Sequence, residues 1–210
     1  MARAREQADD DLLRRSIAGD ENAFVLLYRR WQGPIFRFAL HMSGSPSIAE
    51  DVTQEVFMTL VHGGSRFDPA LGVVSGYLFG IARNQVRRRY EHDRLLVPLS
   101  EPGSGAPELN NGSRSNGTHP GPIVAPVDLS RGETIASVRE AVLSLPGHYR
   151  EVVVLCDLQE MSYEAAAGVL ECAVGTVRSR LHRARAMLAA KLKEIIMPQP
   201  KSAAGRGATP

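Results

Sequence analysis

The chain has 210 residues, enough for one or two domains that each bury a hydrophobic core. Its 25 Lys and Arg against 23 Asp and Glu give a net charge of +2, so the overall charge points to no class of partner. No apolar run approaches the roughly 18 residues of a membrane-spanning helix, and the polar start MARAREQADDD does not resemble a secretory signal. We therefore expect a soluble cytoplasmic protein with no membrane partner.

The N-terminal half predicts a series of helices. After a disordered stretch over residues 1–9, acidic residues open a first helix, which Gly19 ends. Asp20 is a typical helix N-cap and predicts a second helix over ENAFVLLYRRWQ. The pair Gly33-Pro34 interrupts this pattern, and Pro34 suits the first turn of a third helix, IFRFALHMSG.

The next predicted helix, AEDVTQEVFMTLVH, has a capping box at its start, Ser47-Ile48-Ala49-Glu50. Its helical periodicity separates an inner face from an outer one. The inner face contains Val52, Val56, Thr59 and Leu60, and the polar groups Glu50, Asp51, Gln54 and Glu55 lie elsewhere. An outward surface with this many polar groups suggests a docking face for a protein partner.

The carboxylates of this helix also raise the alternative of an enzyme with paired acids or magnesium ligands. No second acidic cluster, phosphate-binding glycine loop or activated nucleophile accompanies them. The two cysteines, Cys156 and Cys172, fit no CxxC or Cys/His metal pattern. We expect no catalytic activity, no metal and no cofactor.

Gly63-Gly64 ends the docking helix, and a loop leads to a last helix of this half, GYLFGIARNQVRRRYEH. The helix mixes aromatic residues with the basic run Arg87, Arg88 and Arg89, a combination that single-stranded nucleic acids use for stacking and backbone binding. The alternative is that Tyr77 and Phe79 belong to the core and the arginines are solvated. Spacing alone slightly favours that alternative.

Composition changes abruptly after this helix. Residues 98–128 hold six Pro and five Gly, too many for a packed core, and predict a tether that spans on the order of 30 Å as a flexible coil. A second capping box at residues 130–133 opens a C-terminal domain with a disordered tail after Met197. Its helices are predicted over residues 131–144, 147–157, 162–170 and 174–193.

The last two of these helices form the arrangement of a helix-turn-helix. Ser162 caps the short helix, a turn of four residues follows, and the longer helix has an apolar stripe. Residues 173–193 contain six Arg or Lys and no acid, whereas residues 140–171 contain six acids and one Arg. A basic helix seen alone could be merely solvated, but in this context we predict that it enters the major groove of DNA.

Both halves resemble an RNA polymerase sigma factor of the sigma-70 family, in the extracytoplasmic-function (ECF) group. AEDVTQEVF and GYLFGIARNQVRRR resemble region 2, and LPGHYREVVVLCDLQEMSYEAAAGVLECAVGTVRSRLHRAR resembles region 4. The resemblance implies an all-α fold of two helical domains joined by a flexible linker. Region 2 would span residues 10–97, the linker 98–132, region 4 133–197 and a disordered tail 198–210.

The resemblance also implies a function and partners. The chain would bind core RNA polymerase through the β′ clamp helices and β, recognise the −35 and −10 promoter elements, and promote strand opening. Many relatives are held by an anti-sigma factor, and the sequence leaves that partner open. The alternative function is a helix-turn-helix regulator that binds an operator without polymerase.

Site residues follow from the same resemblance, residue by residue. The element around residues 66–75 and Asn84 would hold a flipped base of the −10 strand, and Tyr77 stands where the family usually has Trp. Arg178, Ser179 and His182 would face bases of the −35 element, with Gly175, Thr176, Arg180 and Arg183 on phosphates. The polymerase-binding residues would be Asp51, Gln54, Glu55 and Phe57, and the −10 residues Arg66, Tyr77, Arg83, Asn84, Arg87, Arg88 and Arg89.

Overall fold

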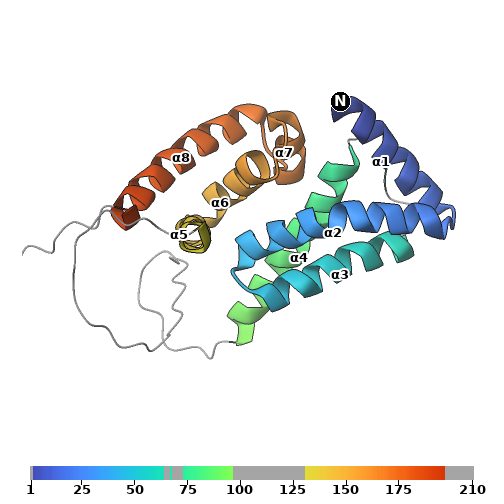
Figure 1. The fold of residues 1–210 in the computed structure, drawn as a ribbon, viewed down its shortest axis with the longest axis horizontal. Coiled ribbons are helices and arrows are strands. Elements are labelled where there is room, and N and C mark those ends of the chain that lie inside the picture. The colour runs from blue at the N-terminus through green and yellow to red at the C-terminus, as the bar shows by residue number, and fades with distance from the viewer. Residues whose placement is uncertain (1, 64–66, 68–72, 97–130, 197–210) are drawn as a thin grey trace, which may run out of the picture.

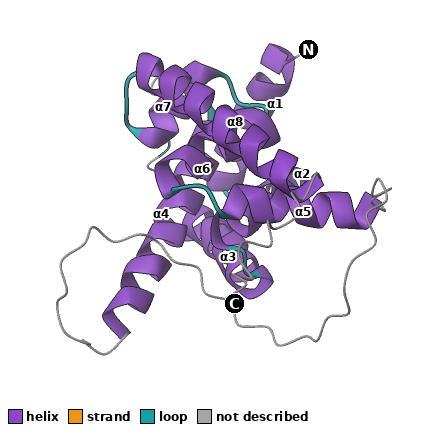
Figure 2. Ribbon diagram, turned by 90° about the vertical axis from the view of Figure 1, so that its left-hand side faces the viewer, coloured by secondary structure: helices purple, strands orange, loops and turns teal. Residues whose placement is uncertain are grey.

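The computed structural model describes residues 2–63, 67, 73–96 and 131–196, and within these ranges the chain is helical without strands (Figures 1 and 2). This confirms the all-α prediction. The N-terminal helices are α1 (Ala2–Ile17), α2 (Glu21–Ser43), α3 (Pro46–Gly63) and α4 (Val74–Leu96). The C-terminal ones are α5 (Arg131–Leu143), α6 (Gly147–Val153), the π-helical turn η2 (Val154–Leu158), α7 (Tyr163–Leu170) and α8 (Val174–Ile196).

The first helix is longer than predicted. It begins at Ala2, so residues 2–9, expected to be disordered, belong to α1. Asp9 is only 3% exposed and forms an ion pair with Arg30 of α2, which ties this part of the helix to its neighbour. Gly19, with φ at 94°, ends the segment as expected, and the Asp20 carboxylate accepts the Ala23 N–H at 3.1 Å as the predicted cap.

The predicted break at Gly33-Pro34 was wrong, because α2 continues through both residues. Proline removes one backbone hydrogen bond from a helix interior, and burial of the following turns offsets that loss. Ile35 and Phe38 are both fully buried. The helix ends at Gly44, whose φ of 73° lies in the left-handed region and whose N–H donates to the Leu40 carbonyl at 2.8 Å.

The start of α3 also differs from the prediction. The helix begins at Pro46, and the cap is Ser45, whose Oγ accepts the Ile48 N–H at 3.4 Å, rather than Ser47. Proline suits the first helical position because its missing N–H would have no partner there. The end of the helix at Gly63 was predicted correctly.

The C-terminal helices lie close to their predicted positions. The predicted helix 147–157 is α6 followed by η2, in which the Gln159 N–H donates to the Val154 carbonyl at 3.0 Å. Ser162 caps α7 by accepting the Ala165 N–H at 3.1 Å, as expected. The last helix, α8, extends to Ile196, three residues beyond the prediction.

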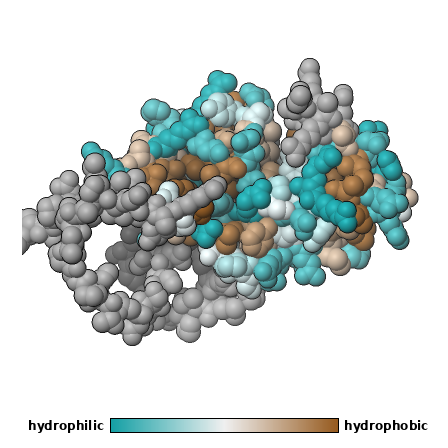
Figure 3. All heavy atoms as spheres, viewed as in Figure 1, coloured by the Kyte–Doolittle hydropathy of each residue, from teal (hydrophilic) through white to brown (hydrophobic). Residues whose placement is uncertain are grey.

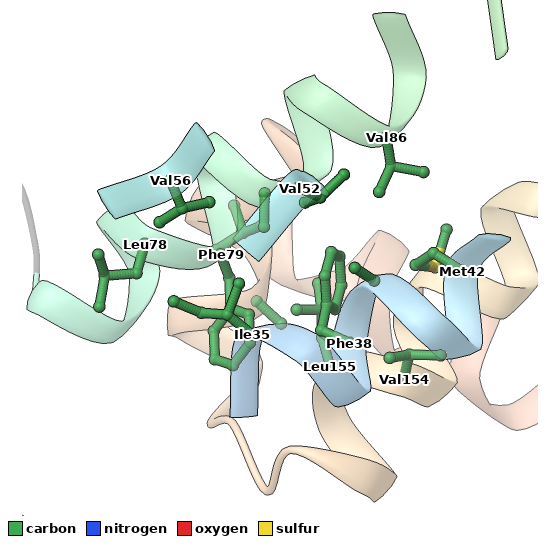
Figure 4. Packing of buried hydrophobic residues seen from close by; sticks show 14 of the residues in the cluster. Ile35, Phe38, Met42, Val52, Val56, Leu78, Phe79, Val86, Val154 and Leu155 are labelled. Atoms are coloured by element: carbon green, nitrogen blue, oxygen red, sulfur yellow. The ribbon is translucent and has the colours of Figure 1, made fainter. Parts of the chain in front are cut away.

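One hydrophobic core joins the two halves of the chain. Phe38 of α2 lies beside Val154 and Leu155 of η2, and all three are fully buried (Figure 4). Helix α7 packs on α4, and α5 packs on α2. The predicted tether falls at residues outside the described ranges, but the two units that it joins are in contact rather than apart.

Candidate polymerase and promoter DNA interfaces

Helix α8 presents one apolar face inward and one basic face outward. Val177, Leu181 and Ala184 are at most 2% exposed, as the apolar stripe predicted. Exposed residues on the other face are Gly175, Arg178, Ser179, His182 and Arg183, and Thr176 and Arg180 are half-buried. The helix therefore has a free basic surface with small residues at its start, which a DNA groove can approach closely.

Two arginines on α8 are held by neighbours. The Arg178 guanidinium lies 5.8 Å from the centre of the Tyr163 ring, a cation–π contact with α7. Arg185 donates to both carboxylate oxygens of Asp157, at 2.6 and 3.0 Å, and these bonds raise the pKa of its guanidinium further above its usual value. Arg185 thus fixes α8 to η2, while Arg178 keeps its donors for another partner.

On α4 the structure separates the predicted −10 residues into two groups. Asn84, Arg87 and Arg88 are exposed. Arg83 instead forms an ion pair with Glu151 of α6 at 2.8 Å, and its Nη1 donates to the Val169 carbonyl at 3.4 Å. In this arrangement Arg83 is a contact between the two halves of the chain.

The other predicted −10 residues that the structure describes, Arg89 and Tyr77, both contact neighbouring side chains. Arg89 donates to the Asp51 carboxylate at 2.9 Å, which joins the predicted polymerase face to the predicted DNA face. Tyr77 is half-buried, with its ring centre 5.3 Å from that of Phe67. Arg66 lies outside the described residues. Phe79 is 2% exposed and belongs to the core, as the alternative interpretation had it.

The predicted polymerase face on α3 is exposed at Asp51, Gln54 and Glu55 but not at Phe57. Phe57 is 3% exposed, and its ring packs against the rings of Tyr28 and Phe24 at 4.7 and 6.2 Å between centres. It was expected to be part of the surface, and it supports the surface from beneath instead.

The sequence prediction missed an apolar surface on α2 and α3. Figure 3 shows brown side chains where α1 ends, α2 begins and α3 ends. We call this the α2–α3 apolar surface; it consists of Ile17, Val25, Tyr28, Met58 and Val61, which are 38–61% exposed. The signal was the run FVLLY, because a helix that is apolar on all sides has more apolar residues than one buried face accommodates.

The described residues show no group of three or more His, Cys, Asp or Glu arranged to hold a metal ion. Burial, and to a lesser degree the neighbouring Asp157, raises the pKa of the Cys156 thiol to about 11, so this thiol stays protonated at neutral pH. In the same part of the chain, no helix has the length and apolar character to span a membrane.

Two different family models match the N-terminal and the C-terminal half of the chain. The sigma-70 region 2 model matches residues 27–95, and the sigma-70 region 4 model matches residues 135–188. The ECF RNA polymerase sigma factor SigM of Mycobacterium tuberculosis (strain H37Rv) is 33% identical over 188 residues, which cover 88% of this chain and 84% of that protein. The chain belongs to the ECF group of the sigma-70 family.

Two further comparisons describe how far the similarity extends. The ECF sigma factor SigE of Mycolicibacterium smegmatis is 32% identical over 166 residues, which are 77% of this chain but only 58% of that longer protein. The solved structure of the sigma factor RpoE with the anti-sigma factor NepR, from Bartonella quintana, aligns with a TM-score of 0.57 and 26% identity. The alignment covers 83% of this chain and 97% of the matched chain in that structure. In this ECF sigma factor, region 2 corresponds to the part of α2 from residue 27 onward with α3 and α4, and region 4 to α5–α8.

Proposed function

We propose that this ECF sigma factor binds core RNA polymerase, recognises the −35 and −10 promoter elements and promotes strand opening. The observation that carries the proposal is the exposed basic face of α8 behind a short capped helix, in one chain with a separate aromatic and basic helix, α4. The first is the geometry of duplex readout, and the second suits a melted strand.

Recognition of the −35 element is assigned to α8. Gly175 and Ser179 are small and exposed, so the start of the helix can lie deep in the major groove. Arg178 can bond both acceptors of a guanine, the commonest specific contact of this kind, and His182 lies one turn further along the same face. Arg183 is exposed at the flank, where phosphates pass.

Recognition of the −10 element is assigned to α4. Asn84 offers an amide to a base edge, and Arg87 and Arg88 are exposed beside it for the strand backbone. Taking a base out of the duplex costs a few kcal/mol, and binding the extruded base offsets that cost. A protein without catalytic groups can stabilise the open promoter in this way.

Binding of core polymerase is assigned to the α2–α3 apolar surface with Gln54 and Glu55 at its edge. Interfaces of this kind place apolar anchors at the centre and polar groups at the rim. The β′ clamp helices are the partner that the family resemblance implies for this face, with β as a further contact. Because RpoE is held by NepR, an anti-sigma factor is a further proposed partner.

The test of this function is to add the purified chain to bacterial core polymerase and a pool of genomic DNA fragments, and to map RNA 5′ ends. We expect a stable complex and initiation at discrete sites, which also yields the −35 and −10 sequences. Specific duplex binding without polymerase, and no initiation even with the cognate enzyme, would instead indicate an operator-binding regulator.

Replacing Arg178 with Ala is expected to weaken promoter binding by about 1–3 kcal/mol, the usual value of a good base contact. The measurement compares the holoenzyme on a promoter duplex with the same duplex altered at the −35 element. The matched control is Arg185→Ala, because Arg185 is already bonded to Asp157 on the same helix. An equal loss on both duplexes would make Arg178 a phosphate contact.

A further inference from the structure

We propose that Tyr163 is a positioning residue for −35 recognition, because its ring holds the Arg178 guanidinium in the orientation that reads a base pair. The proposal rests on the function given above and deepens it, since it names a residue that sets sequence discrimination without contacting a base. Tyr163 is the first residue of α7, and Arg178 lies in the second turn of α8. The two helices of the helix-turn-helix therefore meet at the residue assigned to base readout.

The contact between these two side chains leaves the donors of Arg178 unused. Its guanidinium carbon lies over the Tyr163 ring, 5.8 Å from the ring centre, which is within the range of a cation–π interaction. Among the residues that the structure describes, none forms a hydrogen bond or an ion pair with the Arg178 side chain. Arginine recognises guanine as a flat, two-pronged donor, so the orientation of this group decides whether the contact forms.

The Tyr163 ring is itself held by its neighbours. Tyr163 is half-buried and packs against the hydrophobic core, and Ser162 caps α7 directly before it. On its other side lies Arg185, which donates to both carboxylate oxygens of Asp157. Asp157 raises the pKa of the Arg185 guanidinium most, and the Tyr163 hydroxyl adds to this rise, so the hydroxyl lies beside Arg185. The ring is therefore in place before DNA binds.

The spacing along α8 explains how one ring reaches both arginines. Arg178 and Arg185 are seven residues apart, which is two helical turns on one face and about 10 Å along the axis. The Tyr163 side chain spans this interval, with its ring at Arg178 and its hydroxyl near Arg185. The four side chains thus form one row of contacts from Asp157 in η2 to Arg178 on the exposed face of α8.

An arginine held in this way binds a base pair at a smaller entropic cost than a mobile one. Arginine side chains lose much rotamer freedom when they are ordered, and this loss opposes binding. Tyr163 orders Arg178 before the complex forms, so less freedom is lost on DNA. The effect is confined to the base pair that Arg178 contacts, because the other −35 contacts do not depend on this side chain.

The first experiment measures sequence discrimination by the holoenzyme at each base pair of the −35 element. The base pair read by Arg178 is identified as the position at which Arg178→Ala loses discrimination. We expect Tyr163→Leu, which stays apolar but lacks the ring, to lower discrimination at that position about three- to ten-fold and to leave the other positions unchanged. Tyr163→Phe is the matched control, since it keeps the ring face and should discriminate as the parent does.

A double variant shows whether Tyr163 acts through Arg178. In a chain that already carries Arg178→Ala, Tyr163→Leu should cause no further loss at the same base pair, since the ring then has no guanidinium to hold. A loss as large as in the parent would make Tyr163 a separate contact with DNA. An equal loss at every base pair would make it a support of the fold alone, and better discrimination without the ring would show that it withdraws Arg178 from DNA. Each of these three results overturns the proposal.

The second experiment tests the contact in the free full-length chain, where promoter recognition plays no part. Protons of a guanidinium over an aromatic ring resonate at higher field, so the Arg178 side chain should give a shifted NMR signal. The shift should disappear in Tyr163→Leu and persist in Tyr163→Phe, and a signal that Tyr163→Leu leaves unchanged would overturn the proposal. A shift that is present in a chain whose Arg178→Ala variant keeps full discrimination would instead count against the proposed function, because Arg178 would then read no base.

Discussion

Replacing Phe38 with Ala is expected to lower the free energy of unfolding by about 3–5 kcal/mol, the range for removing a large aromatic from a core. Phe38 is fully buried in the middle of α2, and its ring centre lies 5.4 Å from that of Phe79. On its other side lie Val154 and Leu155 of region 4 (Figure 4). The cavity would therefore open where the two domains meet, lined by side chains of both.

The measurement is urea unfolding followed by far-ultraviolet circular dichroism and by the fluorescence of Trp31. This residue is the single tryptophan, and its ring lies 5.9 Å from that of Phe79, so it reports the same core. The control is Leu26→Ala on the same helix, which is 51% exposed and should change the free energy by less than about 0.5 kcal/mol. Equal destabilisation by the two variants would contradict the position given to Phe38.

Local signals in the sequence were enough to predict most helix ends. Gly19, Asp20 and Ser162 act as their residue types suggest, because a cap depends on side chains within three residues of it. The break expected at Pro34 failed for the opposite reason. Its cost is local, but the burial of Ile35 and Phe38 that offsets the cost comes from α4 and region 4, which the local sequence does not show.

The candidate site was predictable where one helix defines it and less so where two helices meet. The exposed face of α8 follows from its own periodicity, and the structure shows it as expected. The family resemblance placed Phe57 in the polymerase-binding surface, but the rings of Phe24 and Tyr28 on α2 cover it, a contact between helices that neither the resemblance nor the local sequence shows. The contact of Arg83 with Glu151 joins residues 68 positions apart, and spacing gives no sign of it.

Combining Glu55→Lys with Met58→Lys is expected to weaken binding of core polymerase by about 30- to 1,000-fold. Interface residues of the kind that dominate binding each contribute about 2 kcal/mol or more, and 1.4 kcal/mol is a factor of ten. Met58 is 45% exposed in the α2–α3 apolar surface, and Glu55 is exposed one turn before it on α3. A lysine at position 58 brings charge into an apolar contact, and a lysine at position 55 reverses the charge at its rim.

The measurement is competition with labelled wild-type chain for core polymerase, with Glu91→Lys as the control because it reverses an exposed acid on α4, away from this surface. Asp51 is left unchanged, since its pairing with Arg89 would mix an effect on α4 into the result. Both substituted side chains are exposed, so the melting temperature should stay within a few degrees of the parent. A double variant that competes as well as Glu91→Lys would show that polymerase binds elsewhere, and the exposed apolar side chains of α2 and α3 would then need another partner.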